Sequence, residues 1–498
     1  MAIRNTPPNA SAMLESLRGL GYTVATAIAD IVDNSISAGA ATIDIRFEWA
    51  GQDSFVRIVD DGRGMDDASL ESAMRLGARD PREGRARDDL GRFGMGLKTA
   101  SFSQARRLTV ASRTTGGSVA CLRWDLDRIN EGAAGQWPLF EGPEAGSEPR
   151  VSALDTMKHG TVVLWETLDR IVTEGFAATD FHDLVDQVDS HLAMTFHRLV
   201  GPRLSILLNG RKVAPWDPFL TGNPSKRWES DEYQLSGAPD VTVQCHVLPH
   251  RDFLKPEAYE KAGGPAGWTS QQGFYVYRNE RLLLAGTWLR LGERGKAWTR
   301  DEPHRLARIR LDIPNTADAD WKINILKSAA APPARLRTQL TRLATETRLK
   351  ARDVFAFRGG RSVSVPTVAG GLPDLWAART LSQGTTYRIA RDHDIVASVL
   401  DRAGPLRNDL LMLLRVIEET VPVQRIWLDT AEDKETPRTG FAMAPDAEVL
   451  ETLETMFDVL VRHRGLSEDE ARARLARTNP FDRFPALVGQ LTFKDGRN

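Results

Sequence analysis

The stretch Ala29-Asp-Ile-Val-Asp-Asn-Ser-Ile-Ser-Ala-Gly-Ala40 decides how the first part of the chain is interpreted. Apolar residues recur at helical spacing through residues 11–38, and this pattern predicts helix. Asp30 and Asn34 stand four residues apart, so on a helix they project from one face. A carboxylate and an amide side by side could orient a water molecule and ligate a hard cation such as Mg²⁺. An ordinary polar helix face is the alternative for this fragment taken alone.

Two strands follow this helix, and the second ends in a glycine-rich turn. Residues 41–50 alternate as a strand, and residues 54–60 form the next one, which runs into Asp60-Asp-Gly-Arg-Gly-Met65. An aspartate at a strand end can accept a hydrogen bond from the exocyclic amine of adenine, and the glycines allow close approach of the backbone. A tight turn is the alternative, because Asp-Gly pairs are frequent in turns.

A third motif, Gly91-Arg-Phe-Gly-Met-Gly-Leu-Lys98, comes just before another predicted helix. Glycines at a helix N-terminus expose backbone N–H groups, and the helix dipole adds positive potential, so the combination can hold phosphates. The spacing differs from the GxxxxGK(S/T) of a Walker A loop and from the GxGxxG of dinucleotide-binding folds.

Composition restricts the class of protein. The chain has 498 residues, a length that suits about three domains of roughly 100–200 residues each. The formal net charge of −2 excludes a globally basic nucleic-acid binder but allows a local basic patch. Cys121 and Cys245 are too few and too far apart for a disulfide-rich scaffold or a cysteine zinc module. No apolar run approaches the roughly 20 residues of a membrane helix, and the N-terminus lacks an apolar signal-peptide core, so we expect a cytoplasmic protein.

The pattern of elements predicts an α/β protein with layered strands and helices in three domains. Strands alternate with helices over residues 1–178. Residues 179–334 contain a connecting helix, the hairpin signal Asn209-Gly210 and further strands such as residues 273–284, which predicts a second α/β domain. Residues 335–498 open with a long helix and are expected to be mostly helical, with a few short strands.

Taken together and in this order, the three motifs resemble the GHKL ATPase superfamily, which contains gyrase, the heat-shock chaperones, histidine kinases and MutL. The resemblance implies a Bergerat-type ATP-binding sandwich in residues 1–178, a transducer-like second domain, and ATP and Mg²⁺ as cofactors. The segments Gly21–Ala40 and Leu90–Gln104 look most like bacterial relatives of MORC and MutL.

The resemblance also implies a role for each motif. Asp30 would act as the general base, Asn34 would ligate Mg²⁺, and Asp60 would bind the adenine amine. The other residues that would surround the nucleotide are Gly62, Gly64, Met65, Gly91, Gly94, Met95, Gly96, Leu97, Lys98 and Thr161. Residues from about 75 to 96 would form a lid over ATP.

Two positions bear on turnover. Most ATPase members carry Glu where this chain has Asp30, and the shorter side chain predicts slow hydrolysis or, as the alternative, ATP binding with almost no hydrolysis. The MutL, gyrase, chaperone and MORC branches supply a lysine from the second domain to the γ-phosphate, where a cation stabilises transition-state charge. Lys327 is the expected lysine, with Lys322 as the second choice and a plain surface lysine as the alternative.

Basic residues gather near residues 335–361, where the acidic residues are Glu346 and Asp353. Such a cluster predicts contacts with the phosphates of duplex DNA, although a solvated helix face is the alternative. The basic residues are Arg335, Arg337, Arg342, Arg348, Lys350, Arg352, Arg358 and Arg361.

We therefore expect a Mg²⁺-dependent ATPase that closes as a homodimer and acts as an ATP-gated clamp on DNA. The resemblance to MORC-like proteins favours a role in bacterial DNA restriction or phage defence with a partner nuclease, because this chain shows no nuclease motif of its own. A chaperone-like ATPase that acts on protein clients is one alternative. A non-cycling ATP switch that recruits a partner is another.

Overall fold

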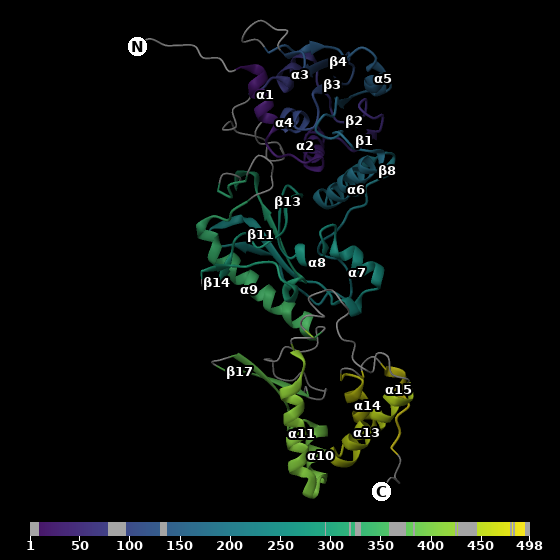
Figure 1. Ribbon diagram of the computed structural model, residues 1–498, viewed down its shortest axis with the longest axis vertical. Helices are drawn as coiled ribbons and strands as arrows, with labels where there is room; N and C mark the ends of the chain where they lie inside the picture. Colours follow the sequence, from purple (N-terminus) through teal and green to yellow (C-terminus); the bar gives the residue numbers. More distant parts are fainter. Residues whose placement is uncertain are drawn as a thin grey trace, which may run out of the picture. The chain divides into compact units, whose positions relative to one another are not determined.

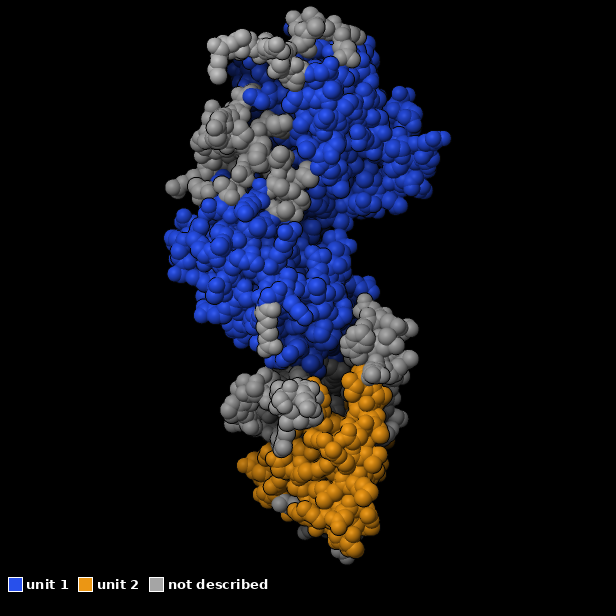
Figure 2. All heavy atoms as spheres, turned by 60° about the vertical axis from the view of Figure 1, so that its left-hand side comes forward, with its two compact units in different colours: residues 1–358 blue, residues 359–498 orange. Residues whose placement is uncertain are grey.

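The computed structural model divides the chain into two units, Met1–Arg358 and Gly359–Asn498 (Figure 2). It describes residues 9–77, 96–129, 137–293, 295–317, 320–323, 330–357, 375–381, 384–423, 426, 446–478, 481 and 484–493. The first unit contains two large sheets with their helices, and the second contains a hairpin and several helices (Figure 1).

The first sheet has eight strands in the order β5-β4-β3-β6-β2-β1-β7-β8. Its pairs are antiparallel except that β1 runs parallel to β7. The strands are β1 (Thr42–Glu48), β2 (Phe55–Asp60), β3 (Arg107–Arg113), β4 (Ala120–Asp125), β5 (Phe140–Glu141), β6 (Gly160–Glu166), β7 (Ser205–Leu208) and β8 (Arg211–Lys212). The helices of this part are α1 (Ala10–Arg18), α2 (Val24–Ser37), α3 (Asp67–Met74), α4 (Gly96–Phe102), α5 (Glu148–Val151) and α6 (Ala178–Thr195).

Helix α2 lies at the centre of this layer of helices and contacts both α4 and α6. The Thr23 hydroxyl accepts a hydrogen bond from the Thr26 N–H, and the Thr26 side chain accepts one from the Thr23 N–H, so a reciprocal cap starts the helix. Ile28, Ile31 and Val32 are almost fully buried, which fixes the rotation of the helix on the sheet. The predicted helix over residues 11–38 is thus two helices, because Gly21 adopts a φ of 86° between them.

The second sheet has the order β10-β11-β16-β12-β13, with β9 paired to β11. Its strands are β9 (Trp228–Glu229), β10 (Tyr233–Leu235), β11 (Ala238–Val247), β12 (Gly273–Arg278), β13 (Arg281–Thr287) and β16 (Ala307–Ile313), and β14 (Gly292–Glu293) pairs with β15 (Lys296–Ala297) nearby. Helices α7 (Pro256–Gly263) and α8 (Gly267–Ser270) belong to the same region. The long helix α9 (Ala334–Phe357) packs Leu336, Leu340 and Ala344 against β11 and β16.

The second unit is mostly helical. It contains the antiparallel pair β17 (Trp376–Leu381) and β18 (Gly384–Ile389), followed by α10 (Asp394–Arg402), α11 (Arg407–Thr420), α13 (Asp446–Arg464), α14 (Glu468–Leu475) and α15 (Pro485–Gly489). The predicted α/β fold class with a helical C-terminal region is therefore confirmed. The predicted domain boundaries at residues 178 and 334 stay predictions, and α9 itself lies within the first unit. Among the described helices, none has the length and apolar character needed to cross a membrane.

Candidate functional site

Asp30 lies on the buried side of α2, where its side chain is fixed by its neighbours. The carboxylate is 6% exposed and accepts a hydrogen bond of 2.8 Å from the Tyr22 hydroxyl at Oδ2. Burial, together with the charge of Asp30, raises the pKa of Tyr22, so the phenol keeps its proton and remains a donor at neutral pH. A Cβ built on Gly96 would lie 3.6 Å from Asp30 Oδ2, so the first turn of α4 stands next to this carboxylate.

Asp60 ends β2 as the sequence predicts, and its carboxylate is 5% exposed. Oδ2 accepts a hydrogen bond of 2.7 Å from the Ser35 hydroxyl, and Oδ1 accepts one of 2.9 Å from the Gly62 N–H. Burial raises the pKa of Asp60, while these hydrogen bonds oppose the shift. The Thr161 backbone also interacts with this carboxylate. A carboxylate has about four acceptor positions, so the group can still accept from an amine.

The turn after Asp60 packs against β3 and β6. Gly64 has a φ of 69°, and a Cβ there would stand 1.8 Å from the Arg113 carbonyl oxygen. The Met65 N–H donates to the Ser112 hydroxyl at 2.8 Å, and that hydroxyl also lies 2.9 Å from the Thr161 hydroxyl. The residues Gly62, Gly64, Met65 and Thr161, predicted from separate parts of the sequence, therefore lie around one turn.

Asn34 follows Asp30 by one helical turn and has an exposed side chain. An exposed amide oxygen is a suitable single ligand for Mg²⁺, which prefers oxygen and commonly completes its shell with water and phosphate oxygens. Within the described residues, no group of three or more His, Cys, Asp or Glu side chains could hold a metal ion. The residues present thus fit a cation that is shared with a phosphate ligand rather than one enclosed by protein groups.

Lys98 adopts a role that the sequence does not predict. Its Nζ donates to the Ala73 carbonyl at 2.8 Å and to the Arg75 carbonyl at 3.0 Å, so the ammonium group caps the C-terminus of α3. The side chain is 2% exposed, and burial lowers the pKa of Lys98 to about 8. Gly96 and Leu97 begin α4, and Leu97 packs partly buried against the main core.

Four predicted site residues lie outside the described residues: Gly91, Gly94, Met95 and Lys327. Most of the predicted lid, residues 78–95, lies there too. Lys322, the second choice for the lysine of the second domain, is exposed and has a φ of 50°.

The structure adds residues that sequence reasoning missed. Ser35 and Ser112 hold Asp60 and Met65, and Asp61 accepts hydrogen bonds of 2.8 Å from both the Ala41 and Thr42 N–H groups. Ser35 follows Asn34 directly, so its position on the helix could be predicted. Its contact with Asp60 could not, because that contact depends on how β2 packs against α2. Arg281 of β13 reaches Asp33 on α2, a partner 248 residues away that no local pattern could reveal.

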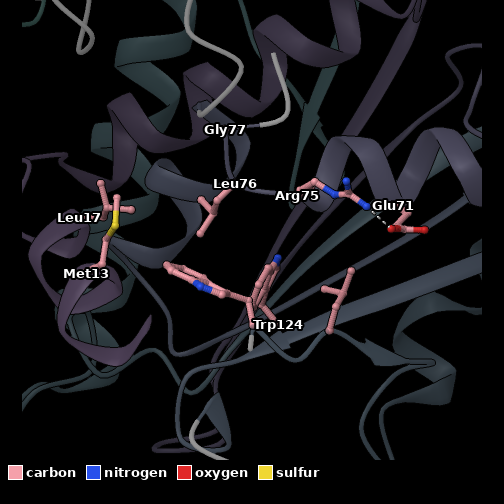
Figure 3. Close-up of a pocket in the computed structure, with 9 residues that line it drawn as sticks. Met13, Leu17, Glu71, Arg75, Leu76, Gly77 and Trp124 are labelled. Carbon is pink, nitrogen blue, oxygen red and sulfur yellow. Dashed lines mark hydrogen bonds and ion pairs between the residues drawn. The ribbon is translucent and has the colours of Figure 1, made fainter. Parts of the chain in front are cut away.

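An apolar cavity of about 510 Å³ lies in the first domain (Figure 3). Its walls come from α1, from the end of α3 and from β4, and the ion pair of Arg75 with Glu71 stands at its edge. None of the predicted nucleotide ligands lines it, so hydrogen-bonding geometry identifies the candidate site better than cavity size does. The lining residues are Met13, Leu17, Glu71, Arg75, Leu76, Gly77, Trp124, Trp137 and Leu139.

The basic helix α9 is less available to a ligand than its sequence suggests. Arg348 is 9% exposed, stacks on the Trp288 and Trp298 rings, and lies 3.4 Å from Asp301. Arg335 pairs with Asp320 at 2.7 Å. The predicted contact of Arg348 with DNA phosphates therefore requires correction, because this side chain is committed to the second core. Arg342 and Arg352 are exposed, whereas Arg358 and Arg361 lie outside the described residues.

Comparisons with known proteins bear on the same residues. Residues 22–161 match the family model described as histidine kinase-, DNA gyrase B-, and HSP90-like ATPase. The chain is 31% identical over 228 residues to the DNA mismatch repair protein MutL of Rhodospirillum rubrum, which covers 44% of this chain and 33% of that protein. It is 30% identical over 192 residues to MutL of Halobacterium salinarum, covering 38% of this chain and 26% of that protein. The chain thus spans about a third or less of the length of these relatives.

The matched segment begins at Tyr22, which holds Asp30, and ends at Thr161, which closes the turn after Asp60. The comparisons and the position of α2 against β2 indicate the same class of domain. Residues 22–161 are a domain of the GHKL ATPase superfamily, of the MutL-like kind.

Proposed function

We propose that this protein binds ATP with Mg²⁺ in its N-terminal domain and hydrolyses the nucleotide slowly. The observation that carries the proposal is the pairing of α2 with the end of β2. Helix α2 carries Asp30 and Asn34. The same helix supplies the Ser35 hydroxyl that donates to the buried carboxylate of Asp60.

Asp60 would select adenine. Its carboxylate accepts from Ser35 and Gly62 and keeps acceptor capacity for an exocyclic amine. Because the carboxylate is buried, a neutral amine donor is a better partner for it than water. Thr161 and Met65, fixed through Ser112, would form the wall beside the base.

Asp30 would act as the general base toward the attacking water. Tyr22 holds one carboxylate oxygen, and the nearby first turn of α4 gives this group a fixed position relative to a phosphate. The shorter side chain of Asp, compared with the Glu of most relatives, supports slow turnover. Asn34 would hold Mg²⁺, which supplies charge neutralisation on the phosphates when bound.

The proposal extends to the second domain and to a dimer. Lys327 would reach the γ-phosphate from the second domain, and ATP binding would favour a closed homodimer by its higher affinity for that state. The exposed Arg342 and Arg352 of α9, and the similarity to proteins named for DNA mismatch repair, support duplex DNA as the partner. Bacterial restriction or phage defence with a partner nuclease is the setting that the resemblance to MORC-like proteins favours.

The test is ATP turnover by the purified chain with and without duplex DNA, next to Asp30→Ala and Asp60→Ala. We expect turnover in the wild type, a rise with DNA, and loss in both variants, with ATP binding kept by Asp30→Ala. Binding without turnover in the wild type would point instead to a switch that recruits a partner. Absence of both binding and turnover would overturn the proposal.

A further inference from the structure

The tip of the β12–β13 hairpin is built in an unusual backbone conformation. Its two turn residues, Asn279 and Glu280, have φ values of 48° and 66°, although neither is glycine. A two-residue turn with both φ values positive matches the twist of a hairpin, but non-glycine residues there carry strain. Arg281 follows at once as the first residue of β13 and pairs in register with Arg278. The turn therefore fixes where the Arg281 side chain leaves the second sheet.

Arg281 reaches out of the second sheet to helix α2 of the first domain. Its Nε donates to Asp33 Oδ1 at 3.1 Å and to Oδ2 at 3.0 Å, and its Nη2 stands 3.9 Å from Asp30 Oδ1. Its Nη1 donates to the Leu282 carbonyl at 2.9 Å, which holds the guanidinium plane. Arg281, Asp33 and Asp30 are 5%, 1% and 6% exposed. This is a buried ion pair between β13 of the second sheet and helix α2, with the candidate general base at its edge.

Arg281 is the side chain that brings positive charge to α2 in this region. His191 of α6 also lies near this pair, and burial, together with the charge of Arg281, lowers the pKa of His191 to about 4. The imidazole is thus neutral at pH 7, and Arg281 supplies positive charge to the two carboxylates. The Phe196 ring lies 5.9 Å from the guanidinium carbon and helps to exclude water from the pair.

Asp33 stands three residues after Asp30 and one before Asn34, so all three leave the same turn of α2. The hydrogen bond from Nε, shared between the two carboxylate oxygens of Asp33, restrains the rotation of that turn, and with it the directions of the Asp30 carboxylate and the Asn34 amide. Asp60 leaves from β2 and is coupled to α2 through the Ser35 hydroxyl, whereas Asp30 and Asn34 leave the restrained turn itself. Loss of the pair should therefore affect the alignment of water and phosphate more than recognition of the base.

We propose that Arg281 is a positioning residue for hydrolysis, which ties the catalytic turn of α2 to the second sheet through Asp33. The inference rests on the proposed ATPase function. In it, the second sheet positions the general base Asp30 through Asp33, independently of any lysine that contacts the γ-phosphate. Since one side chain joins helix α2 to the second sheet, a change at the nucleotide would also reach the β12–β13 hairpin.

The test uses paired substitutions, because removing one partner would leave a buried charge uncompensated and could unfold the domain. The double variant Asp33→Asn/Arg281→Gln keeps shape and hydrogen bonding without charge. Arg281→Lys keeps the charge and loses the hydrogen bond from Nε. Arg203→Gln is the matched control, since Arg203 pairs with Glu280 of the same turn at the surface and does not contact α2.

Four quantities are measured: kcat, the thermal stability, the Kd for a non-hydrolysable ATP analogue, and the change in amide exchange of residues 281–287 when that analogue binds. In the double variant we expect Kd within about 3-fold of the wild type and kcat lower by about 10-fold or more. Arg281→Lys should recover part of kcat, and the control should match the wild type. The analogue should alter exchange in β13 of the wild type and not in the double variant.

The outcomes separate the two proposals. Wild-type turnover with an unchanged kcat in the double variant would overturn the role of Arg281 and leave the ATPase intact. A parallel loss of binding, thermal stability and kcat would show a merely structural ion pair. If the wild type binds the analogue without turnover, the exchange readout decides alone, and the inference is overturned when the analogue still alters β13 exchange in the double variant as it does in the wild type. If the wild type neither binds nor hydrolyses, both proposals fail.

Discussion

Two adjacent aspartates show how burial assigns different work to the same side chain. Asp60 is 5% exposed, and its oxygens contact the Ser35 hydroxyl and the Gly62 N–H. Asp61 instead binds the N–H groups of Ala41 and Thr42 and so ties the turn to the start of β1. The first carboxylate has unused acceptor capacity inside the site, whereas the second supports backbone structure. The sequence Asp60-Asp61 alone does not distinguish them.

This contrast makes a residue-scale prediction. Asp60→Ala should weaken ATP binding by about 10- to 100-fold, because a charge-assisted hydrogen bond contributes roughly 1.5–3 kcal/mol. Asp61→Ala should lower stability by about 1–2 kcal/mol while leaving ATP affinity close to that of the wild type. Calorimetric titration with a non-hydrolysable analogue and urea unfolding measure the two effects. Equal losses of affinity in both variants would contradict the assignment of adenine to Asp60.

At the scale of elements, α3 and α4 are joined by one buried cation. Lys98 on α4 donates to the carbonyls of Ala73 and Arg75 at the C-terminal end of α3. A cation at this end also interacts favourably with the helix dipole. The phosphate role that the resemblance implies for Lys98 would require these two hydrogen bonds to break, so it stays a prediction.

Lys98 predicts a pH dependence of folding. Its pKa falls from 10.5 to about 8, because burial disfavours the charged form. Between these values the unfolded chain binds more protons than the folded one, so Lys98 contributes stability that increases as pH rises through about 8 to 10.5. Urea unfolding at pH 7.5, 9 and 10.5 should show this gain in the wild type relative to Lys98→Met. A constant difference between the two proteins over that range would exclude the shifted pKa.

The turn between β2 and α3 gives a second prediction at this scale. Gly64→Ala should destabilise the domain by more than about 3 kcal/mol, because its Cβ would overlap the Arg113 carbonyl at 1.8 Å. Gly116 is the matched control, since it has a similar φ of 76° and nothing within 4 Å of an added Cβ. Gly116→Ala should cost only about 1–2 kcal/mol, the strain of the backbone alone. Similar unfolding free energies for the two variants would show that the turn can move away from β3.

For the whole molecule, overall charge and local burial together decide where an anionic partner could bind. The net charge is −2, so affinity for DNA must come from a local surface. On α9, Arg348 belongs to the second core and Arg335 is paired, while Arg342 and Arg352 face solvent. The positively charged surface that α9 offers to DNA is therefore smaller than the sequence of the helix suggests.

A prediction at this scale concerns Arg342 and Arg352, two of the exposed arginines of α9. Arg342→Glu/Arg352→Glu should weaken binding to duplex DNA and reduce the slope of log Kd against log salt by about 2, since each contact neutralises one phosphate. ATP affinity should not change. Fluorescence anisotropy with labelled duplex at several salt concentrations measures both the affinity and the slope. DNA binding that matches the wild type would remove α9 from the proposed interface.

Features that depend on short stretches of chain could be predicted from the sequence. The four-residue spacing of Asp30 and Asn34 places them on one helix face, and the alternating pattern before Asp60 places it at a strand end. Helix α9 was recognisable for the same reason. Residues 273–284 were predicted as strand, whereas the structure turns at Asn279 and Glu280 and forms the hairpin β12–β13. The break between α1 and α2 was missed, because Gly21 leaves the apolar spacing on either side unchanged.

The three motifs and the helix and strand periodicity around them could be read from the chain, because spacing and periodicity are local properties. The class of the N-terminal domain came from the resemblance that these motifs carry. The partners of those residues depend on the tertiary structure. In it, the Ser35 hydroxyl donates to Asp60, and Lys98 donates to the end of α3. Arg348 is buried against tryptophan rings, and Arg281 contacts Asp33, which lies 248 positions away in the sequence. Such contacts arise when separate elements pack to bury apolar surface, and charged side chains then find whichever partners that packing leaves within reach.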